Sequence, residues 1–263
     1  MDFDFFMRIT KELKEAGVEE IGLFYLGESF CSPQLLIEAI RYLKQEIDMP
    51  YVFLTTNGSL ATPTVVEECM KAGLNSLKFS INACDREQFE KVMQVRGEFF
   101  EIALNNLAIA KDIRDSNKYP TKIYASSIKY DGEQLAKMEQ LLKERVLPYV
   151  DEHYWLPLYS MGSVATQREE ELGYKPIAGN QGRVGALREP LPCWALFTEG
   201  HITSSGKLSA CCFDADGRFA MADLNDTKFI DGWHSPAFQL LREAHLAKNV
   251  SNTVCEGCIA YAS

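Results

Sequence analysis

The chain has 263 residues, of which 46% are hydrophobic and 24% charged, so it is neither disordered nor fibrous. With 27 Lys and Arg against 37 Asp and Glu, its formal net charge is −10, and no basic run would follow a phosphate backbone. Nucleic acid is therefore not expected as a partner. The longest apolar stretches, such as residues 21–26, are far shorter than a membrane span of roughly 20 residues. The acidic start Met1-Asp2-Phe3-Asp4 is not a signal peptide. We expect a cytoplasmic protein with no membrane partner.

Helical and strand patterns alternate from the start of the chain to about residue 158. Apolar residues at helical spacing over 5–16 predict a first helix that ends at Gly17. Helical segments then separate five predicted strands, at residues 21–26, 51–55, 76–81, 122–129 and 150–158. This order predicts an α/β protein with a parallel sheet, either open or curled into a partial TIM-like (β/α) barrel.

Small or polar residues follow most of these strands. In parallel α/β proteins, functional groups gather at the carboxyl ends of the strands. The segments of interest are therefore 27–29, 56–58, 80–83 and 126–127, together with Tyr159.

The second half of the chain has a different character. Residues 160–191 are rich in Gly and Pro, which predicts a linker or an active-site loop. Extended segments at 194–203 and 207–213 flank Ser204-Ser205-Gly206 and predict a β-hairpin. A third short extended segment follows at 218–224, and a helix begins at Ser235-Pro236. We expect a small hairpin and helix domain here.

Eight cysteines are too few for a disulfide scaffold, and in a reducing compartment they indicate metal binding. Cys31, Cys69 and Cys84 lie singly, and we interpret them as structural. The other five, all in the last 71 residues, are Cys193, Cys211, Cys212, Cys255 and Cys258.

Four of these five thiols are candidate ligands of one centre. Cys193 and Cys211 lie at the two ends of the predicted hairpin, and Cys255 and Cys258 form a CxxC. Four thiolates suit an iron–sulfur cluster or zinc, and the spacing alone does not choose between them. Strand alternation places Cys212 on the opposite face from Cys211. The alternative is that these are buried apolar cysteines.

The same cysteines carry a family resemblance. Pro192-Cys193-Trp194, Gly206-x4-Cys211, Gly232-Trp233 and Cys255-x2-Cys258 resemble the SPASM and twitch extensions of radical SAM enzymes. Those extensions hold auxiliary 4Fe-4S clusters. The resemblance implies that Cys193, Cys211, Cys255 and Cys258 are metal ligands. The chain lacks the further cysteines of a two-cluster SPASM module, so one cluster, as in a twitch domain, is expected.

The first half is similar to the same family. Leu26-Gly27-Glu28 resembles the Gly-Gly-Glu motif that contacts the methionyl amino group of S-adenosylmethionine (AdoMet), with Leu in place of one Gly. Thr55-Thr56-Asn57-Gly58 and Phe79-Ser80-Ile81-Asn82-Ala83 resemble the strand ends that meet the cofactor. The resemblance implies that AdoMet is bound by Gly27, Glu28, Asn57, Ser80 and Asn82.

One family feature is missing from the sequence. Radical SAM enzymes bind their catalytic cluster with CxxxCxxC after the first strand, and these 263 residues contain no such triplet. The motif would precede the first predicted helix, together with the first strand. Either the sequence lacks its native amino terminus, or it is a degenerate relative without radical chemistry. No catalytic residue can be named.

These observations define the expected organisation and function. Residues 1–159 would form a radical SAM-like partial barrel without its first strand, 160–191 a linker, and 192–263 an auxiliary-cluster domain. The complete form would be an enzyme in which a 5′-deoxyadenosyl radical abstracts hydrogen from a peptide or small molecule, with ferredoxin or flavodoxin as reductant. The alternative is a catalytically degenerate or non-enzymatic scaffold whose four cysteines hold zinc or an iron–sulfur cluster.

Overall fold

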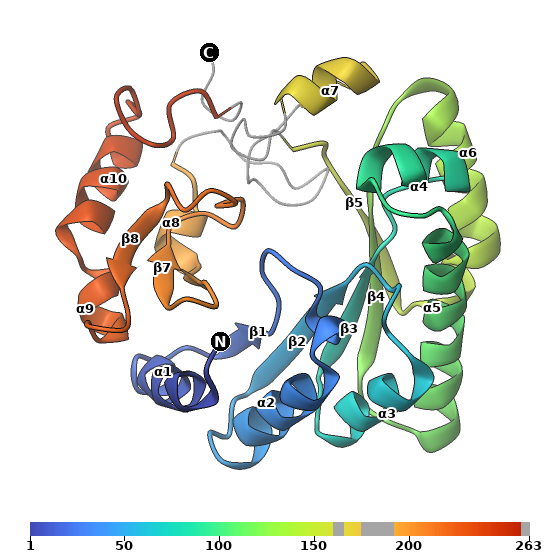
Figure 1. Cartoon of the computed structure of the whole chain (residues 1–263), viewed down its shortest axis with the longest axis horizontal. Helices are drawn as coiled ribbons and strands as arrows, with labels where there is room; N and C mark the ends of the chain where they lie inside the picture. Colours follow the sequence, from blue (N-terminus) through green and yellow to red (C-terminus); the bar gives the residue numbers. More distant parts are fainter. Residues whose placement is uncertain (160–165, 175–191, 259–263) are drawn as a thin grey trace. The chain divides into compact units, whose positions relative to one another are not determined.

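The computed structural model describes residues 1–159, 166–174 and 192–258 (Figure 1). The chain forms two compact units. The first unit is Val18–Leu156, and the second joins Met1–Gly17 to Pro157–Ser263. Most of the expected linker, 160–191, lies outside the described residues, and its described part contains helix α7 (Thr166–Leu172).

A five-stranded parallel sheet forms the centre of the first unit. Its strands are adjacent in the order β1-β2-β3-β4-β5, so the predicted α/β class is confirmed. The first strand is shorter than expected. After Gly22 the chain turns, and the Ser29 hydroxyl donates a hydrogen bond to the Leu23 carbonyl at 2.6 Å. The strand bounds are β1 Glu20–Gly22, β2 Tyr51–Thr56, β3 Ser76–Ser80, β4 Lys122–Ile128 and β5 Glu152–Leu156.

Helices cover one face of this sheet (Figure 1). They are α2 (Pro33–Gln45), α3 (Pro63–Lys71), α4 (Arg86–Met93), α5 (Glu98–Asn117) and α6 (Gly132–Arg145), with short 3-10 turns η1 (Ser29–Cys31) and η2 (Leu147–Tyr149). Successive strand residues point to opposite faces. Side chains on the helix-covered face are fully buried: Val52, Leu54, Leu77, Phe79, Ile123 and Ala125 are all 0% exposed.

The opposite face, which we call the inner face, has a different composition. Strand register places on it Phe53, Thr55, Lys78, Ser80, Tyr124, Ser126 and Tyr154. All except Ser126 are half-buried rather than buried. Polar and aromatic side chains thus occupy a surface that no helix of the first unit covers.

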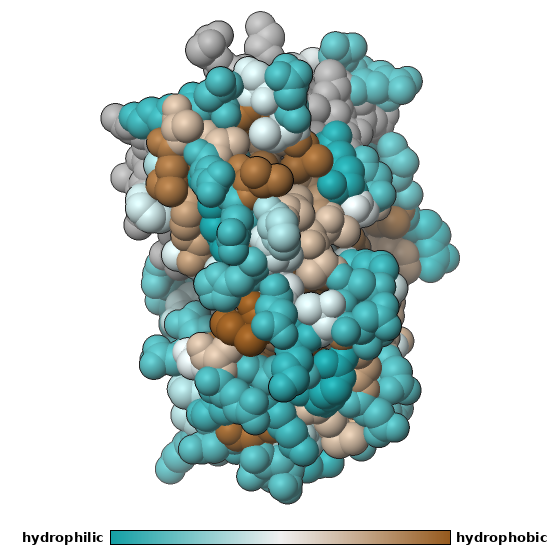
Figure 2. All heavy atoms as spheres, turned by 90° about the vertical axis from the view of Figure 1, so that its left-hand side faces the viewer, coloured by the Kyte–Doolittle hydropathy of each residue, from teal (hydrophilic) through white to brown (hydrophobic). Residues whose placement is uncertain are grey.

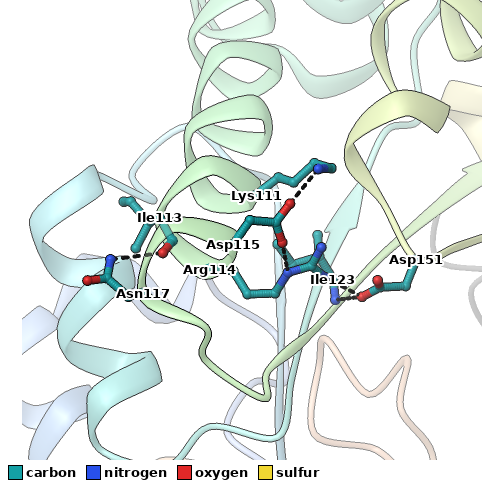
Figure 3. A network of polar contacts seen from close by, with 7 residues as sticks. All are labelled: Lys111, Ile113, Arg114, Asp115, Asn117, Ile123 and Asp151. Atoms are coloured by element: carbon teal, nitrogen blue, oxygen red, sulfur yellow. Dashed lines mark hydrogen bonds and ion pairs between the residues drawn. The ribbon is translucent and has the colours of Figure 1, made fainter.

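A polar network stabilises the amino ends of β4 and β5 (Figure 3). Arg114, near the end of α5, donates to Asp151 at 2.6 Å and to Asp115 at 2.7 Å. Asp151 also accepts from the backbone N–H of Ile123 at 2.8 Å. The network lies at the end of the sheet opposite the carboxyl ends of the strands.

The second unit contains a small antiparallel sheet. Strands β6 (His201–Ile202) and β7 (Lys207–Ser209) form the expected hairpin, and β8 (Ala220–Asp223) pairs with β7. The expected strand over 194–203 is wrong in its first part, because residues Ala195–Thr198 form helix α8. Ala and Leu favour helix, and the Thr198 hydroxyl donates back to the Trp194 carbonyl. Helices α9 (Phe229–Trp233) and α10 (Pro236–Leu246) follow.

The first helix packs in the second unit. Helix α1 (Phe3–Glu15) buries Ile9, and its Glu12 carboxylate accepts a hydrogen bond from the backbone N–H of Phe229 at 2.7 Å. Arg8 donates to the Leu224 carbonyl. These polar contacts join α1 to the carboxyl-terminal part of the same unit.

Figure 2 shows one side of the molecule, where hydrophilic side chains surround separate apolar areas. None of the described helices is both long and apolar enough to span a membrane.

Candidate cofactor and cluster sites

Glu28 connects the segment after β1 to the end of β2. One carboxylate oxygen accepts hydrogen bonds from the Thr56 hydroxyl at 2.8 Å and the Phe30 backbone N–H at 3.1 Å, and the other accepts from the Asn57 backbone N–H at 2.8 Å. The predicted site residues Glu28 and Asn57 are therefore adjacent. Gly27, the residue before Glu28, is exposed, and a Cβ at this position would meet no atom within 4 Å.

The turn after β2 is built by its own side chains. The Asn57 side-chain oxygen accepts from both the backbone N–H and the hydroxyl of Ser59, at 2.9 and 2.6 Å. Gly58 has φ of +80°, and a Cβ there would lie 3.0 Å from Ala103 and Phe79, so this position requires glycine. The oxygens of Glu28 and Asn57 thus hold the turn in place.

Polar atoms around the ends of β3 and β4 have unused hydrogen-bonding capacity. Ser80 is the last residue of β3 and pairs in register with Ser126 on β4. Asn82 lies two residues after Ser80. The Asn82 side-chain oxygen and the Ser126 hydroxyl are buried with no hydrogen-bond partner among the described residues. Buried polar groups are usually paired, so these atoms fit a bound polar ligand such as AdoMet. Ser126 was among the strand-end residues noted from the sequence but not among the predicted site residues.

The four predicted ligand cysteines gather in the second unit. Burial, together with the nearby thiolates of Cys211, Cys193 and Cys258, raises the pKa of the Cys255 thiol to about 12. Such mutual influence requires that these sulfurs lie close together. The structure thus brings together thiols that are as many as 65 residues apart in the sequence, from Cys193 to Cys258.

Cys212 belongs to the same region, contrary to the expectation from strand alternation. That expectation was wrong because β7 ends at Ser209, before either cysteine. The Cys212 thiol donates a hydrogen bond to Cys211, and this bond lowers the pKa of Cys211. The Cys211 sulfur also accepts from the Phe213 backbone N–H at 3.4 Å. Both contacts favour a Cys211 thiolate, which is the form that binds metal.

The geometry does not by itself identify the metal. Within residues 1–159, 166–174 and 192–258, no three side chains of His, Cys, Asp or Glu have the arrangement of a single-ion site. The donor set is nevertheless four thiols, which suits a cluster or a soft metal ion.

The remaining three cysteines lie in the first unit. Cys69 is buried in α3, where burial raises its pKa to about 12. Cys84 is also buried, and its pKa is raised to about 11. Cys31 is exposed at the end of η1. Protonated, buried thiols such as Cys69 are poor ligands, which agrees with their interpretation as structural residues.

Comparisons with known families agree with the fold. A family model described as the radical SAM superfamily matches residues 1–143, and the SPASM iron–sulfur cluster-binding domain model matches residues 193–259. The first match spans more than half of the chain. The protein therefore belongs to the radical SAM superfamily and carries a SPASM domain, as the sequence motifs predicted.

The chain is similar in fold to solved structures of low sequence identity. BtrN in complex with AdoMet and 2-DOIA is 15% identical with a TM-score of 0.58, covering 98% of this chain and 80% of BtrN. Streptococcus suis SuiB bound to S-adenosylmethionine is 16% identical with a TM-score of 0.61, covering 99% and 64%. Native anSMEcpe with bound AdoMet is 12% identical with a TM-score of 0.60, covering 93% and 75%. Comparison with curated protein sequences gave no match.

Proposed function

We propose that this chain is the AdoMet-binding and auxiliary-cluster part of a radical SAM enzyme that removes a hydrogen atom from a peptide or small molecule. The observation that carries the proposal is the gathering of Cys193, Cys211, Cys255 and Cys258 in a domain that matches the SPASM family. When bound, AdoMet and a reduced catalytic cluster supply the 5′-deoxyadenosyl radical.

AdoMet would lie at the carboxyl ends of the parallel strands. Glu28 and Asn57 fix the turn there through their own hydrogen bonds, and the unused atoms of Asn82 and Ser126 are available to a polar ligand. Ser80, at the end of β3, pairs in register with Ser126. The structures of BtrN, SuiB and anSMEcpe contain AdoMet, which supports a cofactor of this kind.

The four thiolates would hold a single 4Fe-4S cluster, as in a twitch domain. Four protein ligands saturate such a cluster and leave no open iron. Its role would therefore be to exchange electrons with the substrate region rather than to bind substrate at an iron or to cleave AdoMet. The potential of the cluster would depend on its burial and on hydrogen bonds to its sulfurs, such as the Phe213 N–H at Cys211.

The experiment is anaerobic reconstitution of the 263-residue chain with iron and sulfide, followed by metal analysis and visible absorption. We expect roughly four irons and four sulfides per chain. Cys255→Ser should lose most of this iron, whereas Cys31→Ser, an exposed thiol outside the group, should retain it. Iron that stays bound in Cys255→Ser would contradict the proposed ligand set.

The same material tests activity. Because the sequence has no CxxxCxxC, we expect no 5′-deoxyadenosine from the 263-residue chain with AdoMet and dithionite. Supplying an upstream strand and CxxxCxxC, if its gene encodes them, should raise iron to roughly eight and give the product. Product from the 263-residue chain itself would mean that a cysteine we interpret as structural is a catalytic ligand.

The second candidate is a scaffold whose four cysteines hold zinc or a structural cluster. A donor set of four thiols suits zinc as well as a cluster. A colourless protein with one zinc per chain would support this candidate over the first. For the enzyme, we propose a ferredoxin or flavodoxin as reductant and the cytoplasm as location, because the chain is acidic and rich in cysteines outside any disulfide framework.

A further inference from the structure

Lys78 occupies an unusual place on the inner face. It lies within β3, the central strand of the five, and its register neighbours are Thr55 on β2 and Tyr124 on β4. Its side chain is half-buried, and its ammonium group lies 5.8 Å from the centre of the Tyr154 ring. Lysine on a central strand of a parallel sheet is uncommon, because such strands are largely apolar.

No acidic side chain among the described residues forms an ion pair with Lys78. Other lysines of the first unit do have such partners: Lys137 lies 3.1 Å from Glu133, and Lys71 lies 2.9 Å from Glu68. A half-buried cation loses part of its hydration and is stabilised by an anion that approaches it. The Tyr154 ring compensates only in part.

Hydroxyl groups beside Lys78 also have unused hydrogen-bonding capacity. The Thr55 hydroxyl is buried without a partner among the described residues, although Thr55 is the register neighbour of Lys78. Ser126, whose hydroxyl is likewise unused, is 0% exposed and neighbours Ser80, two residues beyond Lys78. An ammonium group flanked by hydroxyl donors on the same face is a complementary arrangement for oxygen anions.

We propose that Lys78 and Thr55 bind an anionic group of the substrate, a carboxylate or a phosphate, on the inner face. The Tyr154 ring beside the ammonium group, with Phe53 and Tyr124 on the same face, would contact an apolar or aromatic part of the same molecule. The identification of the ligand as the substrate rests on the proposed function. The existence of an anion site at Lys78 and Thr55 does not depend on that function.

The test measures binding of small aromatic anions to the full chain, purified anaerobically with its measured iron content. The probes are phenyl phosphate and benzoate, which separate phosphate from carboxylate, with neutral benzyl alcohol and cationic benzylamine as controls. Binding is followed by calorimetry and by NMR of the ¹³C-dimethylated lysines, in which the Lys78 signal is the one absent from Lys78→Arg.

We expect at least one anion to bind and to shift the Lys78 signal, while the neutral and cationic probes do not. Lys78→Met should weaken this binding about ten- to hundredfold, as expected for loss of a charged hydrogen bond. Lys78→Arg should retain most of it, and Thr55→Val should weaken it severalfold. Lys143→Met, which removes an exposed lysine from α6, is the matched control and should change nothing.

Three results would overturn the proposal. These are no anion binding at millimolar concentration, equal binding by wild type and a folded Lys78→Met, or equal binding of benzyl alcohol. If Lys78→Met does not fold, two other measurements test the proposal. It then fails if anions do not shift the Lys78 signal of the wild type, or if Thr55→Val binds them as tightly as the wild type. Because these measurements need no AdoMet cleavage, their failure is distinct from a missing cluster, which the iron analysis reports separately.

Discussion

The backbone N–H of Cys193 donates a hydrogen bond to Nδ1 of His245 at 3.2 Å, across 52 residues. His245 is 0% exposed in α10, and Arg242 on the same helix donates to the Leu196 carbonyl at 2.8 Å. Since Nδ1 accepts, the ring proton is assigned to Nε2. Helix α10 thereby fixes the segment that carries the first of the four ligand cysteines, although His245 is not itself a predicted ligand.

Replacing His245 with Phe should therefore loosen the Cys193 segment. The part-buried Cys193 N–H loses its acceptor, at a cost of about 1 to 3 kcal/mol in the free energy of unfolding. Urea unfolding measures this cost, and the electron paramagnetic resonance spectrum of the reduced cluster should change in line shape. His245→Asn, which keeps an acceptor, should be milder, and exposed His234→Phe is the control. An unchanged spectrum in a folded His245→Phe would contradict a positioning role.

Cys212→Ser should leave the cluster in place. Its thiol donates to Cys211 but is not one of the four proposed ligands, and Ser can still donate. Roughly four irons per chain are expected in this variant, against a large loss in Cys211→Ser. Iron and sulfide analysis distinguishes the two. If Cys212→Ser loses as much iron as Cys211→Ser, Cys212 is a ligand and the proposed set is wrong.

Glu28→Ala should destabilise the first unit and weaken AdoMet binding together. Three hydrogen bonds to the carboxylate are lost, including the one from the Asn57 N–H, with an expected cost of about 2 to 4 kcal/mol. Thermal unfolding and equilibrium dialysis with AdoMet measure the two effects. Glu38→Ala, an exposed change on α2, serves as the comparison. Equal stability of Glu28→Ala and Glu38→Ala would show that Glu28 does not hold the turn.

Gly206→Ala should cost more stability than Gly217→Ala. Both glycines have positive φ, +84° and +80°, so both substitutions strain the backbone. Only at Gly206 would the new Cβ meet another group, the Asn225 side chain at 2.7 Å, which donates to the Ser205 carbonyl. We expect about 1 to 2 kcal/mol for Gly217→Ala and clearly more for Gly206→Ala. Equal free energies of unfolding would mean that Asn225 moves aside without cost.

Acid should destabilise the first unit partly through His153. Burial lowers the pKa of His153, whose Nε2 lies 3.1 Å from the Ser127 hydroxyl. The unfolded state then binds a proton that the folded state does not, so this contribution to stability is complete above about pH 6.5 and decreases as the pH falls below it. His153→Gln should flatten the dependence of the unfolding free energy on pH, and His234→Gln should not. A steeper dependence of the unfolding free energy on pH in His153→Gln would show that His153 does not cause the acid destabilisation.

Local patterns in the sequence determined most of the secondary structure. Asp85 illustrates this. Its spacing from Gln88 predicted a helix N-cap, and its carboxylate accepts a hydrogen bond from the Gln88 N–H at 2.8 Å at the start of α4. The alternation of strands and helices along the chain likewise indicated the parallel sheet, because parallel neighbouring strands need a long crossover connection, which is usually a helix. The cysteine and glycine spacing indicated the family, since ligand spacing follows from local turn geometry.

Only the tertiary structure decided which elements meet. The periodicity of α1 shows that one helix face is buried but not which partner buries it, and the Glu12 to Phe229 contact places it in the second unit. The position of Cys212 depended on β7 ending at Ser209, before both Cys211 and Cys212, so that strand alternation does not apply to them. Lys78 looks like an ordinary surface lysine in the sequence. Register with Thr55 and Tyr124 puts it on the inner face, because strand pairing joins residues whose separation along the chain carries no local signal.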